Sequence, residues 1–120
     1  PELASTHFLV QRMGFGRASE MCLSGRLYPA SEAHQAGLVD VLTTADELVA
    51  KAFAIADGIA ANPDPQLRMT KQLLTENGSA TDLSAVQERE SVLLRECWKS
   101  AEHKEAVSAF LEKRPPRFRA

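Results

Sequence analysis

Residues 43–74, "TTADELVAKAFAIADGIAANPDPQLRMTKQLL", give the clearest folding signal in the chain. Thr44 and Glu47 have the spacing of a capping box, in which two side chains satisfy free amides at the start of a helix. Asp64 as an N-cap and Pro65 at the first helical position predict the start of a second helix. Apolar residues at helical spacing follow Glu47 and form the predicted inner face of the first helix: Leu48, Ala52, Ile55, Ala56 and Ile59.

The chain before this stretch is divided by glycines, which end helices because glycine enters the left-handed region without penalty. We expect helices over residues 3–13 and 17–23, ended by Gly14 and Gly25, and a short helix between Pro29 and Gly37. One short β-rich run follows and is the only convincing strand. It contains Leu38, Val39, Val41 and Leu42, with Leu27–Tyr28 as a candidate partner.

The chain after this stretch predicts a long helix from about Asp82 to Lys99. Ser100 can cap a last helix, which Pro115-Pro116 terminates. The predicted fold class is therefore mainly α with one short β element. Several apolar stripes are broad, as expected for a helical domain that also packs against something else.

Composition sets limits on partners and compartment. The 120 residues are 44% hydrophobic and 25% charged with a net charge of −2, which provides no overall attraction for nucleic acid or an anionic membrane. No apolar run approaches the ~20 residues of a membrane span. Cys22 and Cys97 lack Cys-x-x-Cys spacing and indicate a reducing compartment, taken as the cytoplasm, although a mitochondrion or peroxisome also fits. The three histidines show no metal-ligand spacing, so we expect no metal.

The basic tail is the clearest candidate binding segment. Aromatic rings beside cations suit a nucleotide, because a ring stacks on a base while a cation holds a phosphate. The alternative is a solvated basic terminus. The tail residues are Phe110, Lys113, Arg114, Arg117, Phe118 and Arg119.

An ordered set of short motifs runs along almost the whole chain: Pro1-Glu2, Ser5, Gly14, Ala18, Glu20, Ser24-Gly25-Arg26, Glu32-Ala33, Gly37-Leu38-Val39, Asn62-Pro63, Lys71 and Phe110 to Arg114. Taken in this order, the motifs resemble the second half of the enoyl-CoA hydratase/isomerase (crotonase) superfamily. The sequence departs from the family pattern at Leu3-Ala4, where small residues such as Gly-Gly are usual, and at Gln11, where proline is usual.

The resemblance implies the C-terminal helical part, a trimerisation or lid region, of an α/β crotonase-like fold. Residues 1–43 would form the end of the crotonase core, and residues 44–120 the C-terminal helical region. In such an enzyme the preceding half holds the oxyanion donors and the acyl-CoA pocket. The chain is therefore expected to be a fragment that is inactive alone.

The resemblance also implies site residues. It is closest to Δ3,Δ2-enoyl-CoA isomerase-like members, in which the acid at the position of Glu2 moves a proton between C2 and C4 of the acyl chain. The alternative for Glu2 is an acid that stabilises a helix N-terminus. Phe110 and Lys113, three residues apart and so expected on one helix face, would contact the adenine and phosphates of CoA.

The implied function is double-bond isomerisation or hydration of acyl-CoA thioesters through an enolate held in an oxyanion hole. No separate cofactor is expected, because CoA is part of the substrate. The intact enzyme would be a homo-oligomer, either a trimer or a dimer of trimers. The alternative is a non-catalytic crotonase-like oligomerisation or interaction module.

Overall fold

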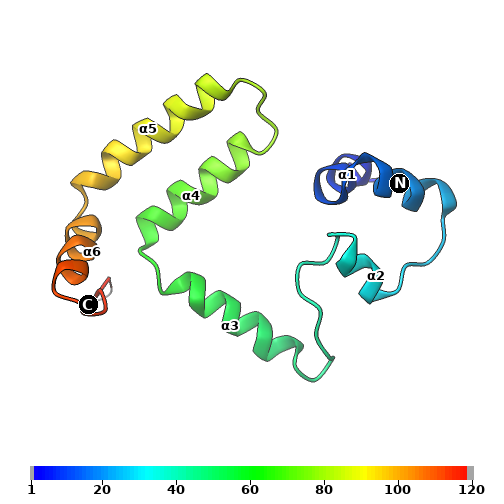
Figure 1. Ribbon diagram of the computed structural model, residues 1–120, viewed down its shortest axis with the longest axis horizontal. Coiled ribbons are helices and arrows are strands. Elements are labelled where there is room, and N and C mark those ends of the chain that lie inside the picture. Colours follow the sequence, from blue (N-terminus) through cyan, green and yellow to red (C-terminus); the bar gives the residue numbers. More distant parts are fainter. Residues whose placement is uncertain (1, 119–120) are drawn as a thin grey trace. The chain divides into compact units, whose positions relative to one another are not determined.

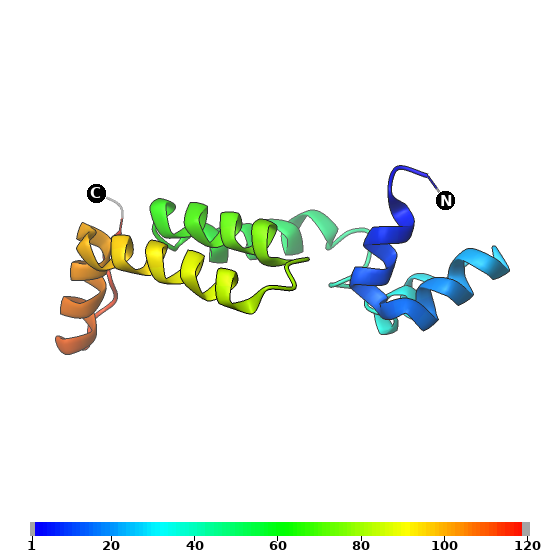
Figure 2. The ribbon, with the colours of Figure 1, turned by 90° about the horizontal axis from the view of Figure 1, so that it is seen from above.

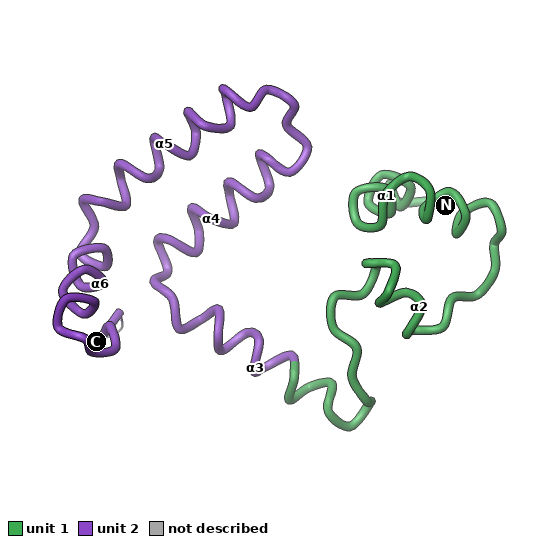
Figure 3. The backbone as a smooth tube through the Cα atoms, viewed as in Figure 1, with its two compact units in different colours: residues 1–51 green, residues 52–120 purple. Residues whose placement is uncertain are grey.

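The structure, a computed structural model, describes residues 2–118 and forms six helices with no strand in that range (Figure 1). The chain divides into two compact units, residues 1–51 and 52–120, and α3 spans their boundary (Figure 3). The predicted division between residues 43 and 44 stays a prediction. The helices are α1 (Ser5–Ser24), α2 (Ala30–Gln35), α3 (Leu48–Ala60), α4 (Asp64–Asn77), α5 (Leu83–Lys99) and α6 (Ala101–Leu111).

The first unit is built around α1, which is broken at Gly14 as predicted. Gly14 has φ 77° and ψ 162°, so the helical segments on either side of it point in different directions. Gly25 ends α1 in the left-handed conformation at φ 61°, and its N–H donates to the carbonyl of Met21. The two helices expected over residues 3–13 and 17–23 are therefore the two halves of one kinked element.

α2 ends in a Schellman motif, in which a left-handed residue closes the helix. The turn formed by this motif packs against α1. Gly37 has φ 86° and donates to the carbonyl of His34 at 3.0 Å, while the Leu38 N–H donates to the carbonyl of Ala33 at 2.9 Å. The turn places Leu38 against the small core of this unit. The buried residues of that core are Met13, Ala18 and Ala36, with Leu9 and Met21 packed on them.

The predicted β element over Leu38–Leu42 is wrong, and the Schellman motif supplies the reason. A strand needs its amides for a neighbouring strand. Here the N–H groups of Leu38 and Val39 both donate to the carbonyl of Ala33, and the Val39 carbonyl lies 2.8 Å from Nδ1 of His34. The expected partner segment also does not pair, since Leu27 is 95% exposed. Helix capping has therefore used the hydrogen-bonding groups that a strand would need.

Arg26 stabilises the segment that connects α1 to α2. Its Nε donates to Glu20 at 2.9 Å, and its guanidinium also binds Glu32 with one bond of 2.9 Å. The same guanidinium lies 3.7 Å from the ring centre of Tyr28. The hydrogen bonds from Arg26 lower the pKa of the Glu32 carboxyl. This ionic cluster sets the path of the connecting segment.

The second unit contains α4 and α5, which run antiparallel side by side in Figures 1 and 2. Polar bonds fix both ends of the pair. Arg89 Nε donates to Asn77 Oδ1 at 2.8 Å near the connecting loop, and Gln66 Nε2 donates to Ser100 Oγ at 3.0 Å at the opposite end. The register of the two helices is thus set by side chains as well as by apolar contact.

The predicted helix starts in this region are largely confirmed. Asp82 caps α5 by accepting from the amides of Ser84 and Ala85, and Ser100 caps α6 by accepting from the amide of His103. The start of α4 lies one residue earlier than expected, because Pro63 occupies the N-cap position and Asp64 the first helical one.

The capping box predicted from Thr44 and Glu47 is met only in part. The two side chains pair, but the Thr44 hydroxyl donates to the carboxylate instead of accepting from the Glu47 amide, and α3 begins at Leu48. The Thr44 hydroxyl donates to the Glu47 carboxylate at 2.8 Å, and Thr43 adds a longer bond of 3.3 Å. These hydrogen bonds and one from the Thr44 amide lower the pKa of Glu47. The carboxylate is therefore held ahead of the first turn of α3, which begins at Leu48.

Few side chains are buried within residues 2–118: Met13, Ala18, Ala33, Ala36 and Ala109. The apolar stripe of α3 is largely exposed, with Phe53 at 64% and Ile59 at 54%. An apolar surface of this kind usually marks a region that packs on another protein surface. The broad apolar stripes noted in the sequence are thus not buried by contacts among the described residues.

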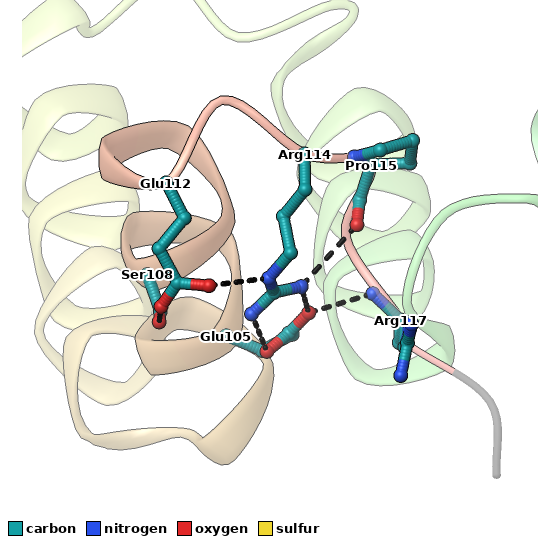
Figure 4. Close-up of polar contacts among 6 residues, drawn as sticks. All are labelled: Glu105, Ser108, Glu112, Arg114, Pro115 and Arg117. Carbon is teal, nitrogen blue, oxygen red and sulfur yellow. Dashed lines mark hydrogen bonds and ion pairs between the residues drawn. The ribbon is translucent and has the colours of Figure 1, made fainter.

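Residues 112–117 fold back onto α6 through an ionic cluster, here called the C-terminal clasp: Glu105, Ser108, Glu112, Arg114 and Arg117 (Figure 4). The Arg114 guanidinium donates to both oxygens of Glu105 at 2.5 and 3.1 Å and, through Nε, to Glu112 at 2.7 Å. The Arg117 amide donates to Glu105 at 2.8 Å. These bonds lower the pKa of Glu105 to about 2 and also lower the pKa of Glu112, to which Ser108 donates.

The close approach at Gly37 predicts a stability effect. A Cβ at this position would lie 3.1 Å from the carbonyl oxygen of Arg12, and the residue that carries it would have to keep φ 86°. Gly37→Ala should therefore destabilise the protein by about 1–2 kcal/mol. Urea unfolding of the native polypeptide followed by circular dichroism measures the change.

Gly16→Ala is the matched control, because Gly16 lies in the helical part of α1 and an alanine Cβ there would point into open space. Alanine has the better helix propensity, so this variant should be neutral or slightly stabilising. Equal unfolding midpoints for the two variants would contradict the packing described for Gly37.

The clasp predicts a pH-dependent contribution to stability. The pKa of Glu105 is about 2 in the folded chain, against an ordinary value of 4.5. Because the folded-state pKa is depressed, the stabilisation is present above about pH 4.5 and is lost as the pH falls toward 2. Glu105→Gln should lower the urea midpoint at pH 7, and its difference from the native protein should shrink over this interval. Glu96→Gln, at an exposed position of α5, is the control. A difference that does not change with pH would refute the assignment.

Candidate functional site

Glu2 lies in the turn that leads into α1, and its main chain is fixed while its side chain is exposed. The Glu2 N–H donates to Ser5 Oγ at 3.1 Å, and its carbonyl accepts from the Ser5 amide at 3.0 Å. The carboxylate makes no hydrogen bond or ion pair with any other residue in the range 2–118. Ser5, which matches the family pattern, therefore fixes the main chain of Glu2 and leaves its carboxylate exposed. Pro1, the other half of the Pro-Glu pair, lies outside the described residues.

The turn after Glu2 adopts a conformation that favours glycine. Leu3 and Ala4 have φ 54° and 59°, and both side chains are exposed. The family pattern has glycine at the position of Leu3, which agrees with the left-handed backbone found there. The departure from the pattern thus leaves the turn in place, at the cost of backbone strain.

The alternative role for Glu2, an acid that stabilises a helix N-terminus, stays a prediction. Glu2 lies two residues before Ala4, the N-cap of α1, and the first turn of α1 contains no acidic residue. The effect of the helix dipole is largest close to the helix end.

Phe110 and Lys113 lie close in the chain, but the prediction that they share one helix face is wrong. Phe110 is in the last turn of α6 and is 81% exposed, whereas α6 ends at Leu111 and Lys113 has φ 55°. The amide of Lys113 donates to the Phe110 carbonyl at 3.2 Å, and the Arg114 amide donates to the Ala109 carbonyl at 3.0 Å. These bonds form a Schellman motif with lysine in the position where glycine is usual.

The cations of the basic tail differ in their availability. Arg114 is paired with Glu105 and Glu112, whereas the exposed Lys113 has no ion pair among residues 2–118. Phe118 is half-buried, and Arg119 lies outside the described residues. Lys113 therefore combines an unpaired ammonium with an exposed ring three residues earlier in the chain.

Within residues 2–118, the non-glycine residues with positive φ are Leu3, Ala4 and Lys113. All three lie at or next to the site residues expected from the sequence. Strained backbone tends to collect at functional sites, since it persists only where the surroundings impose it. Sequence reasoning missed the strain at Lys113, and no signal could have revealed it, because lysine has no left-handed preference.

The second unit also has an open apolar groove of about 600 Å³ between α4 and α5. Its lining includes Met69, Leu73, Leu94 and Cys97, and the Cys97 Sγ lies 3.6 Å from the Met69 Sδ. The sequence did not predict this groove. Glu2 belongs to the first unit, and the groove, Phe110 and Lys113 belong to the second.

The described part of the chain holds neither a metal-binding cluster nor a membrane-spanning helix. No three histidine, cysteine or acidic side chains there come together as a metal site would require. None of the helices has both the length and the apolar character needed to cross a bilayer. Cys22 and Cys97 are both free thiols.

Comparison with known proteins gives consistent results. A family model described as enoyl-CoA hydratase/isomerase matches residues 1–120. The chain is 32% identical over 120 residues to the 2,3-dehydroadipyl-CoA hydratase of Escherichia coli, covering 99% of this chain and 46% of the relative. It is 30% identical over 114 residues to the short-chain-enoyl-CoA hydratase of Clostridium acetobutylicum, covering 95% of this chain and 43% of the relative.

Solved structures share the same arrangement. An enoyl-CoA hydratase from Bacillus anthracis superposes with a TM-score of 0.86 at 31% identity, covering 94% of this chain and 43% of that one. A Geobacillus kaustophilus structure described as an enoyl-CoA hydratase subunit gives 0.89 at 29% identity, covering 99% and 46%.

The chain thus spans less than half the length of these relatives. The crotonase resemblance drawn from the sequence is confirmed, as is the helical part of that fold. Because the family model covers every residue, the chain belongs to the enoyl-CoA hydratase/isomerase family.

Proposed function

We propose that this chain is part of an enzyme that isomerises or hydrates the double bond of an acyl-CoA thioester through an enolate. The observation that supports this most is the carboxylate of Glu2, which is exposed and has no partner among residues 2–118, in a family member. It belongs to a strained turn whose main chain is bonded to Ser5. A thioester makes its α-proton acidic when aimed donors stabilise the enolate oxygen. A carboxylate within hydrogen-bond reach of the α-carbon can then transfer that proton.

Glu2 is proposed as the proton-transfer group. In an isomerisation it would take a proton from C2 and return it at C4, which needs one carboxylate in reach of both carbons. The related proteins named above are hydratases, and their names favour addition of water instead. The acid in the Pro-Glu pair favours isomerisation. Because these two indications point to different reactions, the proposal includes both.

The nucleotide end of CoA is assigned to Phe110 and Lys113. The exposed ring of Phe110 can stack on adenine, and stacking of a base on an aromatic side chain contributes roughly 1–3 kcal/mol. The ammonium of Lys113 is a compact charge suited to a phosphate, and it is not neutralised within the described chain. No cofactor is needed besides CoA, which enters with the substrate.

The enzyme is proposed to work as a homo-oligomer, a trimer or a dimer of trimers, in a reducing compartment such as the cytoplasm. The exposed apolar faces of α3 and α5 support an assembly, and the free thiols of Cys22 and Cys97 support the compartment. Residues 1–120 alone are proposed to be inactive, because they span less than half the length of the related enzymes that they match.

A second candidate function is a non-catalytic module that mediates oligomerisation or protein interaction. The observation in its favour is the large share of exposed apolar side chains, including Phe53, Ile59 and Trp98. Such a module would use the helical faces and would have no need of the carboxylate of Glu2. The effect of replacing Glu2 therefore separates the two candidates.

Glu2→Gln in the complete native polypeptide should lower kcat for a 3-enoyl-CoA or 2-enoyl-CoA roughly 10²- to 10⁴-fold, the usual contribution of a general base. The amide keeps the size of the side chain but cannot accept the proton. Conversion of the double bond, followed by ultraviolet absorbance and mass spectrometry, measures the effect.

Glu96→Gln serves as the matched control, since this exposed acid on α5 is not one of the proposed site residues, and it should leave kcat unchanged. An active native protein whose Glu2→Gln variant keeps full activity would remove Glu2 from the mechanism. A complete native polypeptide without turnover, but with the same oligomeric state, would support the non-catalytic module.

Phe110→Ala should weaken binding of butanoyl-CoA roughly 5- to 100-fold, the range that corresponds to loss of one stacked base. Binding of butanoyl-pantetheine, which lacks the nucleotide, should be unchanged. Isothermal titration calorimetry with both ligands measures the two dissociation constants. Leu111→Ala, which removes a neighbouring exposed apolar side chain, is the control. An equal loss for both ligands would contradict a nucleotide contact.

A further inference from the structure

We infer that Glu105 is a positioning residue for CoA: by binding Arg114 in the C-terminal clasp, it holds Lys113 in the left-handed conformation that presents the lysine to the phosphates. This inference rests on the proposed function, which assigns Lys113 to the nucleotide end of CoA. Glu105 itself does not touch the ligand.

The residues on both sides of Lys113 are fixed by the clasp. Glu112 accepts from Ser108 Oγ and from Arg114 Nε, each at 2.7 Å. Arg114 is bound through its other guanidinium nitrogens to the Glu105 carboxylate at 2.5 and 3.1 Å. Figure 4 shows the Arg114 guanidinium lying between the two carboxylates. Lys113 is thus the residue between two anchored neighbours.

The backbone at Lys113 needs such support. A non-glycine residue in the left-handed region is unfavourable, because its Cβ approaches a carbonyl oxygen. Lys113 adopts φ 55°, and its amide and that of Arg114 close the Schellman motif on the carbonyls of Phe110 and Ala109. The motif reverses the chain at the end of α6, and the clasp bonds hold the reversed chain in place.

The segment after Lys113 disfavours continuation of α6 and so stabilises the chain reversal. Arg114 precedes Pro115, so the α region is disfavoured for it and the chain leaves the helix extended. Its Nη1 also donates to the carbonyl of Pro115 at 3.3 Å, and the amide of Arg117 returns to Glu105 at 2.8 Å. One carboxylate therefore ties together the two residues that flank the proline pair.

The same contacts remove Arg114 from competition for a ligand, whereas the exposed side chains of Lys113 and Arg117 have no ion pair among residues 2–118. Arg114 faces two carboxylates, so its charge is compensated within the clasp. Lys113 is exposed and has no partner among residues 2–118, and Phe110 beside it is also exposed. Glu105 thus does two things: it fixes the backbone at Lys113, and it occupies the arginine that would otherwise compete for phosphate.

A double-mutant cycle in the complete native polypeptide tests the inference, with dissociation constants for butanoyl-CoA and butanoyl-pantetheine from titration calorimetry. Lys113→Ala should weaken butanoyl-CoA roughly 10-fold, which corresponds to one lost charge-assisted contact. Glu105→Gln should weaken it roughly 3- to 10-fold, and should have no further effect in the Lys113→Ala background. Neither change should alter binding of butanoyl-pantetheine.

Glu88→Gln is the matched control, since it breaks the exposed ion pair between Glu88 and Arg95 on α5 without touching the clasp, and it should leave both constants unchanged. If circular dichroism shows that Glu105→Gln does not fold, Glu112→Gln loosens the other side of Arg114 and takes its place in the same cycle.

The outcomes separate the inference from the proposed function. If Lys113→Ala weakens butanoyl-CoA but Glu105→Gln does not, the positioning role is refuted and the nucleotide site stands. The positioning role is also refuted if Glu105→Gln weakens both ligands equally or acts independently of Lys113. If Lys113→Ala has no effect on either ligand, the proposed nucleotide contact fails, and the positioning role fails with it.

Discussion

Left-handed residues at the ends of helices are the constraint on which the arrangement of the site residues depends. Leu3 and Ala4 set the turn that carries Glu2, and Lys113 closes α6 beside Phe110. A side chain in this conformation is unfavourable, so each turn persists through specific hydrogen bonds. Ser5 supplies them at the first turn, and the C-terminal clasp supplies them at the second. Strain and function therefore coincide at two places far apart in the sequence.

Exposed apolar helix faces are the second feature that characterises this structure. The helices form with good caps, as at Asp82 and Ser100, but the described residues bury little beyond the small core around Met13. Secondary structure here is thus set by local signals, while most of the apolar surface remains available. Hydrophobic burial is the main favourable term in folding, and an exposed apolar surface of this extent usually marks a region that packs on another protein surface. This is consistent with relatives that are about twice as long.

Local chemistry explains which features could be predicted from the sequence. Glycine, proline and capping residues have direct backbone consequences, so the break at Gly14, the end at Gly25 and the caps at Asp82 and Ser100 were predictable. The absence of a strand at Leu38 was not, because the capping of α2 used its amides. The ordered motifs were sufficient to identify the family. The clasp was not predictable, because no periodic pattern in the sequence marks the contact between Glu105 and Arg114. The left-handed backbone at Lys113 was not predictable either, because lysine has no preference for it. Sequence spacing placed Lys113 on a helix that had already ended.

The central claim is that the carboxylate of Glu2 meets the α-carbon of an acyl-CoA thioester. The most direct measurement is the distance from the Glu2 carboxylate oxygens to C2 of the acyl chain, in a crystal structure of the complete native polypeptide with a bound unreactive acyl-CoA. We expect a distance of about 3–3.5 Å, the range of a group poised for proton transfer. A bound acyl-CoA whose C2 lies beyond the reach of Glu2, with a different acid beside it, would contradict the account.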